Sequence, residues 1–272
     1  MPRGTPFMDS TVLVTGGGSG LGRVLACGAA QRGARVVVWD LVAERADAVR
    51  DIIRSHGREA SSAAVDVTDR EAVERAAAQA GPVDVLVNNA GVVGGRLFLD
   101  STPEQVERVL AVNLHSLYWV TRAFLPGMVE RHGGTVVNVA SAASLIGSAK
   151  MSDYAASKFG ALGLTDALRN EMRVGKTGVN TMIVCPYYMS TGMFDGVATR
   201  SSWLLPILRP QTVAIKVLNG IERGAQQVIE PPFVRVVPLL RVLPPRVFDA
   251  AADLFGINHT MDDFVGREGD RV

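Results

Sequence analysis

The chain has 272 residues, and 47% of them are hydrophobic, which is enough to bury the core of one α/β domain. The 28 basic and 27 acidic residues leave a formal net charge of +1, which argues against a nucleic-acid partner and against an acidic tail. Cys27 and Cys185 are too few and too far apart for a disulfide framework or a metal site, so we expect a reducing cytoplasm. Residues 1–10 contain no long apolar run, so we expect no signal peptide and no integral membrane segment there.

Short apolar runs alternate with longer amphipathic patterns between residues 11 and 185. The apolar runs predict buried strands at 11–15, 35–40, 63–67, 83–88, 134–140 and 180–185. The amphipathic patterns predict helices at 21–32, 44–56, 69–80, 103–129 and 152–174. This alternation is typical of a parallel sheet covered by helices on both faces. We therefore predict an α/β fold with a doubly wound, Rossmann-type sheet, as one domain over 1–272 with its core at 10–230.

The regular alternation stops after residue 185. Residues 186–215 predict a loop with an irregular helix, which we assign as a substrate loop, and 228–229 predict a last strand. Residues 231–272 form a C-terminal extension, which is apolar and rich in proline up to residue 248. Three arginines are spaced along it, namely Arg235, Arg241 and Arg246. Three alternatives stay open for 231–248: contact with the substrate, with a second subunit, or with a membrane surface whose anionic lipids bind the arginines.

A glycine-rich turn, Thr15-Gly-Gly-Gly-Ser-Gly-Leu-Gly22, lies between the first predicted strand and the first helix. Glycines let the backbone turn sharply and approach a pyrophosphate, and the N-terminus of the next helix faces that anion with N–H groups. Many turns of this kind carry glycine for structural reasons alone, so the neighbouring strand ends must support the assignment. The cofactor-binding residues predicted by the turn are Gly16, Ser19, Gly20, Leu21 and Gly22.

An acidic residue, Asp40, ends the second predicted strand. A carboxylate there accepts hydrogen bonds from both ribose hydroxyls of an adenosine and repels a 2′-phosphate, which favours NAD over NADP. Arg23 argues weakly in the other direction, and a simple turn residue is the structural alternative for Asp40. Because ligands bind beyond the carboxyl ends of parallel strands, the residues after the third and fourth strands belong to the same predicted site. They are Asp66, Val67, Asn89, Ala90 and Gly91.

Tyr154 and Lys158 are four residues apart, so they share one face of a predicted helix. A free tyrosine has a pKa near ~10 and is a poor base at neutral pH. A nearby ammonium group lowers that pKa by favouring the phenolate, so the tyrosine can then take a proton from an alcohol. The same lysine can hold the hydroxyls of the nicotinamide ribose. The spacing alone is common on helix surfaces, so it depends on other residues for support.

Two further polar residues are candidates for the same chemistry. Ser141 follows the strand at 134–140, and its hydroxyl can orient and polarise a substrate oxygen; Ser144 is a rival, which we rank second. Asn113 is predicted to lie in the middle of a helix, where asparagine is a poor helix former. This position suggests a role for its side chain, such as holding a water that relays protons to Lys158. The structural alternative is a buried asparagine with all its hydrogen bonds made.

The order and spacing of these residues resemble the short-chain dehydrogenase/reductase family. The matching elements are Thr15-Gly16-x-x-x-Gly20-x-Gly22, Asn88-Asn89-Ala90-Gly91, Asn113, Ser141 and Tyr154-x-x-x-Lys158, within about residues 10 to 230. The resemblance implies that Tyr154 is the acid/base, Lys158 its activator, Ser141 the substrate orienter and Asn113 the relay residue. It also implies a homodimer or homotetramer built on the helices at 103–129 and 152–174.

The sequence after the sixth strand departs from the family pattern of Pro-Gly followed by a threonine. Tyr187 follows Pro186 in place of the glycine, whereas Thr191 keeps its place, so we expect Pro186, Met189 and Thr191 to contact the nicotinamide half of NAD. The residues Cys-Pro-Tyr and Thr-Gly-Met-Phe in this region resemble the branch of retinol, long-chain alcohol and hydroxysteroid dehydrogenases.

The substrate loop is apolar, and its large side chains are Met193, Phe194, Trp203, Leu204 and Leu205. Together with the apolar extension, they predict a lipophilic secondary alcohol or its ketone, steroid-like or retinoid-like, as substrate. Packing against a neighbouring subunit is the alternative explanation. Two other classes of function also stay open. One is a catalytically silent NAD-sensing regulatory protein, which would not need Ser141, Tyr154 and Lys158 together. The other is a scaffold subunit, which would not need Asp40 and the glycine turn.

Overall fold

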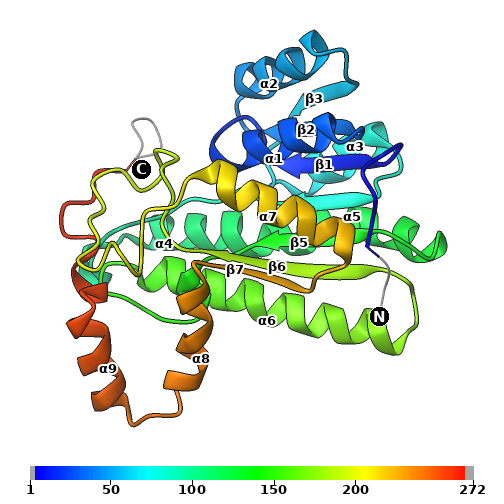
Figure 1. Cartoon of the computed structure of the whole chain (residues 1–272). Helices are drawn as coiled ribbons and strands as arrows, with labels where there is room; N and C mark the ends of the chain where they lie inside the picture. Colours follow the sequence, from blue (N-terminus) through cyan, green and yellow to red (C-terminus); the bar gives the residue numbers. More distant parts are fainter. Residues whose placement is uncertain (1–3, 267–272) are drawn as a thin grey trace.

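Seven parallel strands form one sheet, with the order β3-β2-β1-β4-β5-β6-β7, in a computed structural model that describes residues 4–266 (Figure 1). The strands are β1 Thr11–Thr15, β2 Arg35–Asp40, β3 Ala60–Ala64, β4 Val85–Asn88, β5 Thr135–Val139, β6 Asn180–Pro186 and β7 Gln227–Glu230. The order reverses direction between β1 and β4, which is the point where doubly wound sheets bind ligands. The predicted Rossmann-type sheet is therefore confirmed.

Helices cover both faces of this sheet. They are α1 Gly20–Gln31, α2 Ala43–Ser55, α3 Arg70–Ala80, α4 Pro103–Leu110, α5 Ser116–Glu130, α6 Ser152–Val174 and α7 Pro210–Arg223. Two more helices, α8 Val237–Leu240 and α9 Pro245–Leu254, follow in the C-terminal extension. Val12 and Val14 pack with α1, α2 and α7, whereas Leu13 between them packs with α3 and α5. Successive side chains of a strand point to opposite faces, so a strand covered on both sides must be apolar throughout.

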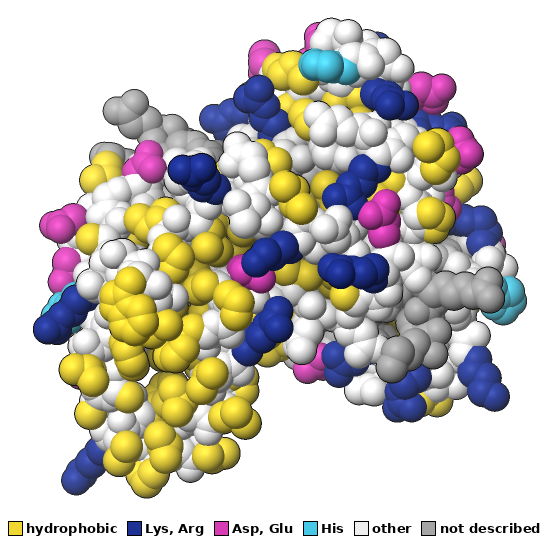
Figure 2. Space-filling model, in the orientation of Figure 1, with side chains coloured by type: hydrophobic (Ala, Val, Ile, Leu, Met, Phe, Trp, Pro, Cys, Tyr) yellow, Lys and Arg dark blue, Asp and Glu magenta, His cyan; other side chains and the backbone are white. Residues whose placement is uncertain are grey.

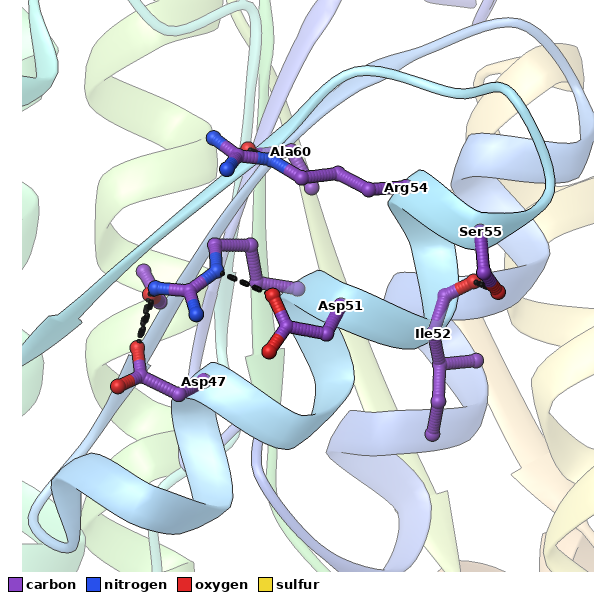
Figure 3. Close-up of polar contacts among 8 residues, drawn as sticks. Asp47, Asp51, Ile52, Arg54, Ser55 and Ala60 are labelled. Atoms are coloured by element: carbon purple, nitrogen blue, oxygen red, sulfur yellow. Dashed lines mark hydrogen bonds and ion pairs between the residues drawn. The ribbon is translucent and has the colours of Figure 1, made fainter.

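The third strand begins and ends three residues earlier than the predicted 63–67. It lies at the edge of the sheet, where side chains of α2 hydrogen-bond to it (Figure 3). Arg54 Nε donates to the carbonyl oxygen of Ala60 at 2.8 Å, and the Ser62 hydroxyl donates to Asp47 Oδ1 at 2.6 Å. An apolar run is a poor guide to such a strand, because a neighbouring helix satisfies the hydroxyl of Ser62. Asp66 therefore follows the strand instead of ending it.

The helix predicted at 103–129 is divided by a π-helical turn, Ala111–His115, between α4 and α5. A π-helical turn inserts an extra residue into a helix, and such turns are frequent at functional sites. Asn113 lies in this turn and is buried. The asparagine that is a poor helix former thus lies where the regular α-helix is interrupted, although the sequence did not predict the interruption.

The predicted loop at 186–215 is wrong at its end, because α7 begins at Pro210. Proline at the first helical position fits the fixed φ of a helix start, and Gly224 ends the helix in the left-handed region with φ +68°. Val213, Val217 and Ile221 recur every fourth residue and are buried against the sheet. Both end signals and the apolar row were present in the sequence.

The C-terminal extension is mostly helical. A 3₁₀ turn at Pro232–Val236 leads into α8 and α9, which project away from the sheet as a hairpin (Figure 1). The last part of the predicted extension, 267–272, lies outside the described residues. No helix among residues 4–266 combines the length and the apolarity that crossing a bilayer requires.

Candidate active site

A cleft of about 480 Å³ runs along the carboxyl edge of the sheet. Residues at or just after the ends of six neighbouring strands line it, in the order β3, β2, β1, β4, β5 and β6. The cleft therefore crosses the switch point between β1 and β4. Most residues that the sequence predicted for the site lie on its walls. They are Gly16, Ser19, Gly20, Leu21, Asp40, Asp66, Val67, Asn89, Ala90, Gly91, Ser141, Tyr154, Lys158, Pro186, Met189 and Thr191. Gly22 and Asn113 lie behind the walls instead.

The glycine turn fits closely against the end of β4. Gly16 has φ +59°, and a Cβ atom there would lie 2.9 Å from the Cα of Ala90. At Gly22, a Cβ atom would lie 2.2 Å from the carbonyl oxygen of Gly16 and 2.5 Å from Asn89 Nδ2. The assignment of Gly22 to direct cofactor contact is therefore corrected: this glycine lets α1 pack against the turn, and the turn faces the cleft.

Asn89 fixes the turn from the other side. Its side-chain amide donates to the carbonyl oxygens of Thr15 at 3.0 Å and Gly16 at 3.1 Å. The Thr15 hydroxyl accepts from the backbone N–H groups of Asn89 and Ala90. These bonds hold the start of the turn and the end of β4 at one spacing, so the backbone that faces an anion is set before any ligand binds.

The carboxylate of Asp40 closes the end of the cleft that lies beside the glycine turn, where the sequence predicts the adenosine half of the cofactor (the nucleotide end). It is buried and accepts from the backbone N–H groups of Gly18 at 3.0 Å and Val42 at 3.1 Å. Arg45, in the first turn of α2, also lines this end, and it was not among the predicted site residues. Its place five residues after Asp40, at the start of a helix that borders the cleft, is the sequence signal that would have identified it.

The side chains of Tyr154 and Lys158 lie in the first two turns of α6 and are both buried. Lys158 Nζ lies 5.5 Å from the centre of the Tyr154 ring and donates to the carbonyl oxygen of Val139 at 3.0 Å. Burial raises the pKa of the Tyr154 phenol, and a hydrogen bond with Ser141 opposes that rise. Burial also lowers the pKa of Lys158 to about 8. A further positive charge in the cleft would lower the pKa of Tyr154.

The two candidate serines have different surroundings. Ser141 lines the cleft, where its hydroxyl accepts from the N–H of Ala143 at 3.1 Å. Ser144 is buried behind the wall, and its hydroxyl accepts from the backbone N–H of Ser141 at 3.3 Å. Ser144 also hydrogen-bonds to the thiol of Cys185, whose pKa burial raises to about 12. The geometry therefore gives Ser141 the access to a substrate, whereas Ser144 supports the backbone beneath it.

The side chain of Asn113 is occupied by protein groups. Its amide oxygen accepts from the N–H of Val92 at 2.9 Å, and its amide nitrogen donates to the carbonyl oxygen of Val92 at 2.9 Å and to the Ser157 hydroxyl at 3.1 Å. These bonds tie the segment after β4 to α6, one residue before Lys158. The sequence suggested that this side chain holds a water. In the structure its amide bonds to protein groups instead, and it therefore positions the two segments that it joins.

Aromatic and apolar residues enclose the opposite end of the cleft, beside Tyr154, where the sequence predicts the substrate (the substrate end). Phe194 lies edge-on to the Tyr154 ring with 5.9 Å between ring centres, and Met193 and Tyr187 complete that wall. The other large side chains of the loop lie elsewhere: Leu204 and Leu205 pack into the protein interior, and Trp203 is 83% exposed. Of the five apolar residues expected over the substrate, only Met193 and Phe194 line the described cleft.

The C-terminal segment packs against this end from outside. The Tyr188 hydroxyl shares a 2.9 Å hydrogen bond with Thr260, and Lys150 forms a 2.9 Å ion pair with Asp262. Met261 is buried in one cluster with Tyr154 and Tyr188. The sequence offered no signal for these contacts, because the partners are far apart in the chain.

The donors and the shape of the cleft fit a dinucleotide. The Gly16 turn leaves space where a side chain would press on β4, the N-terminal end of α1 faces the cleft, and Asp40 offers carboxylate oxygens at one extreme. Tyr154, Ser141 and Lys158 lie at the other extreme, beside an apolar wall. Within residues 4–266, no three His, Cys, Asp or Glu side chains are grouped as metal ligands.

Comparison with known proteins agrees with this geometry. Residues 10–201 match the family model described as short chain dehydrogenase. Epidermal retinol dehydrogenase 2 of Mus musculus is 39% identical, over 94% of this chain and 85% of the mouse protein. Retinol dehydrogenase 10-B of Xenopus laevis is 35% identical, over 98% of this chain and 88% of the frog protein.

Solved structures give the same result. A short-chain dehydrogenase/reductase from Burkholderia phymatum in complex with NAD superposes with a TM-score of 0.80 and 26% identity, over 88% of this chain and 94% of that one. A metagenomic short-chain oxidoreductase in complex with NADP gives a TM-score of 0.70 and 29% identity, over 83% and 97%. A nicotinamide dinucleotide thus binds to both neighbours, one with and one without the 2′-phosphate.

Proposed function

The chain belongs to the short-chain dehydrogenase family and is an oxidoreductase of CH–OH groups, and we propose that it interconverts a lipophilic alcohol of steroid or retinoid size with its carbonyl compound, using NAD. The observation that carries this proposal is the grouping of Tyr154, Ser141 and Lys158 beside the apolar wall of Phe194 and Met193. The relatives named retinol dehydrogenases support a retinoid-like substrate. Because retinol is a primary alcohol, the proposal includes primary alcohols beside the secondary alcohols that the sequence suggested.

Tyr154 is proposed to take the hydroxyl proton of the alcohol and to return it in the reverse reaction. A bound nicotinamide dinucleotide would supply the hydride acceptor that oxidation of the carbinol carbon requires. Ser141 donates a hydrogen bond to the substrate oxygen, and Lys158 stabilises the phenolate of Tyr154 by its charge. In the ligand-free protein, burial raises the pKa of Tyr154. The tyrosine is therefore expected to remain protonated at neutral pH until another positive charge enters the cleft.

A preference for NAD is proposed from the carboxylate of Asp40. It faces the cleft at the nucleotide end, where it would bind ribose hydroxyls and repel a 2′-phosphate. Arg45 lines the same end and favours the phosphate, so the two side chains oppose each other in the choice of cofactor. Asp40 is buried and held by two backbone N–H groups, whereas Arg45 is only half-buried, so we give Asp40 the larger influence.

The remaining proposals concern assembly and location. A homodimer or homotetramer built on α4, α5 and α6 follows from the family resemblance, and light scattering after size-exclusion chromatography measures it. A reducing, cytoplasmic location is proposed from Cys27 and Cys185, which are both free thiols.

The proposed reaction is tested by measuring NAD and NADP reduction against lipophilic primary and secondary alcohols, including a retinoid and a hydroxysteroid. Tyr154→Phe is expected to lower kcat by about a thousandfold while NAD still binds. Tyr118→Phe is the matched control, because Tyr118 is an exposed tyrosine outside the cleft. Tight NAD binding without turnover of any alcohol or carbonyl compound would favour the NAD-sensing alternative and overturn the proposal.

A further inference from the structure

Two rows of apolar side chains are exposed along the α8–α9 hairpin, residues 237–254 with their base at 232–236. Val236, Leu239 and Leu243 follow each other at three- and four-residue spacing, and Leu239 is 71% exposed. Val247 and Leu254 form a second row on α9. Val242, 85% exposed, lies at the turn between the two helices. Figure 2 shows that hydrophobic side chains cover most of this projecting part of the molecule.

The rows are not the core-facing side of these helices. On α9, Ala252 is buried and Phe255 contacts Phe233 with 5.8 Å between ring centres, so the helix already packs one apolar side on the protein. Val247 and Leu254 are on another side. An amphipathic helix normally presents polar residues away from the core, and a contiguous exposed apolar patch marks an interaction surface.

Arginines border the exposed rows. Arg235 and Arg246 are exposed, and within residues 4–266 neither side chain makes a hydrogen bond or an ion pair. Arg241 is tied to the body, because its guanidinium donates to the carbonyl oxygen of Leu145 at 3.0 Å and lies over the Phe159 ring. The hairpin also carries two acidic residues on α9, which are four residues apart and outside the apolar row, namely Asp249 and Asp253. Three arginines and two aspartates leave a small positive charge on the hairpin.

The base of the hairpin is continuous with the substrate end of the cleft. Tyr187 lines the cleft and also packs in one apolar cluster with Phe233 and Val237. The same tyrosine contacts the ring of Tyr188 with 4.7 Å between ring centres. A hydrophobic molecule held against the hairpin would therefore be close to the apolar wall of the cleft.

We propose that the α8–α9 hairpin inserts its apolar rows into the interface of an anionic phospholipid bilayer, with Arg235 and Arg246 bound to lipid headgroups. An amphipathic element of this kind lies in the headgroup region with its apolar side toward the acyl chains. An anionic bilayer matches both the apolar rows and the arginines beside them, because its apolar layer lies directly beneath a layer of negative charge. Docking does not depend on the proposed reaction, although delivery of a lipophilic substrate to the cleft does.

The test is flotation of the purified full-length protein with phosphatidylcholine vesicles, with and without phosphatidylserine. The wild-type protein is expected to float with the phosphatidylserine vesicles. The double variant Leu239→Asp/Val242→Asp is expected to lose at least tenfold in partitioning, because two carboxylates would enter the apolar layer. Arg246→Gln is expected to lose about fivefold on anionic vesicles and little on neutral ones, as one basic residue near such a surface contributes about 1 kcal/mol.

Matched controls separate docking from general effects of the substitutions. Val174→Asp/Ile215→Asp introduces the same two carboxylates at residues that are 71% and 55% exposed, at the far end of α6 and on α7, and Arg58→Gln removes an exposed arginine elsewhere. Both are expected to float like the wild-type protein. Thermal unfolding and NAD binding show whether each variant is folded, and they do so without any assumption about the substrate.

Three results would overturn the proposal. In the first, the folded wild-type protein stays unbound with both kinds of vesicle. In the second, Val174→Asp/Ile215→Asp weakens flotation as strongly as the double variant on the hairpin. In the third, light scattering without vesicles shows an oligomer that the hairpin double variant dissociates, which would assign the hairpin to contact between copies of the chain. Loss of flotation with normal turnover, or the reverse, distinguishes failure of docking from failure of the proposed reaction.

Discussion

The two ends of the cleft are built in different ways. At the nucleotide end, Asp40 and Asn89 lie at or next to the end of a strand, and their hydrogen bonds join neighbouring strands. At the substrate end, the contacts join distant parts of the chain: Tyr188 and Thr260 are 72 residues apart, and Lys150 and Asp262 are 112 apart. The parallel sheet fixes the first end through its register, whereas the second depends on a loop and on the C-terminal segment.

In the proposed function, this difference separates the residues for cofactor binding and proton transfer from those that select the substrate. A rigid sheet edge holds cofactor and reacting groups at fixed distances, and loops around it can vary without disturbing them. We therefore expect substitutions at the nucleotide and catalytic positions to change cofactor binding or turnover strongly. Substitutions at the substrate end should mainly change KM for the alcohol.

The largest effect is expected for Lys158→Met. Loss of the charge that stabilises the Tyr154 phenolate should lower kcat at least a hundredfold and move the pH profile of alcohol oxidation to higher pH. The same variant should unfold at higher temperature at pH 7. The pKa of Lys158 is lowered from 10.5 to about 8, so the folded state disfavours its charge by about 3 kcal/mol.

The sign of this effect follows from proton linkage. Between pH 8 and 10.5, the unfolded wild-type chain keeps a proton that the folded protein has lost, so the free energy of unfolding rises with pH over that range. Denaturant titrations at several pH values should show this rise in the wild-type protein and not in Lys158→Met. An unchanged rise in the variant would assign it to another group.

The next effect tests the rigidity of the nucleotide end. Gly22→Ala places a methyl group against the Gly16 carbonyl and Asn89, so we expect about 2 kcal/mol less stability and at least a tenfold higher Kd for NAD. Gly163→Ala, also in a helix, has no neighbour within 4 Å and should stabilise by about 0.5 to 1 kcal/mol. Calorimetric titration and thermal unfolding measure both. Equal Kd values for the two variants would mean that the turn adapts easily.

Asp40→Asn addresses cofactor choice. Removing the charge should raise the Kd for NAD about tenfold, because hydrogen bonds to charged groups contribute about 1.5 kcal/mol or more, and should tighten NADP binding by relieving repulsion. Asp66→Asn, on the wall but at an exposed residue, should change either Kd less than about threefold, because water and salt screen an exposed charge. Wild-type protein that binds NADP more tightly than NAD would assign the dominant role to Arg45.

The smallest effect concerns the long-range contact at the substrate end. Tyr188→Phe removes the hydrogen bond to Thr260 and should lower the free energy of unfolding by about 1 kcal/mol. We expect KM for the alcohol to rise a few-fold while the Kd for NAD stays unchanged. Denaturant unfolding and steady-state kinetics measure these quantities. If NAD binding weakened as much as alcohol binding, the two ends of the cleft would not be independent.

Features with a local physical cause were determined by the sequence. Apolar runs predicted the buried strands, because strands covered on both faces must be apolar, and the bounds of α6 were predicted at 152–174. The turn from Gly16 and the positions of Asp40, Ser141 and Tyr154 placed the site at the carboxyl edge, since parallel strands bring their ends together. The edge strand β3 was misplaced, because the polar Ser62 within it depends on α2 for its hydrogen bonds.

The tertiary structure decided what depends on distant neighbours. It placed Gly22 and the Asn113 side chain behind the wall of the cleft, and it assigned Ser141 rather than Ser144 to the open side. The closure of the substrate end over Tyr188 and the exposure of both apolar rows on the α8–α9 hairpin were likewise visible only in the folded chain. Local spacing sets which side chains share a face of an element, but burial and partners are set by the elements packed against that face.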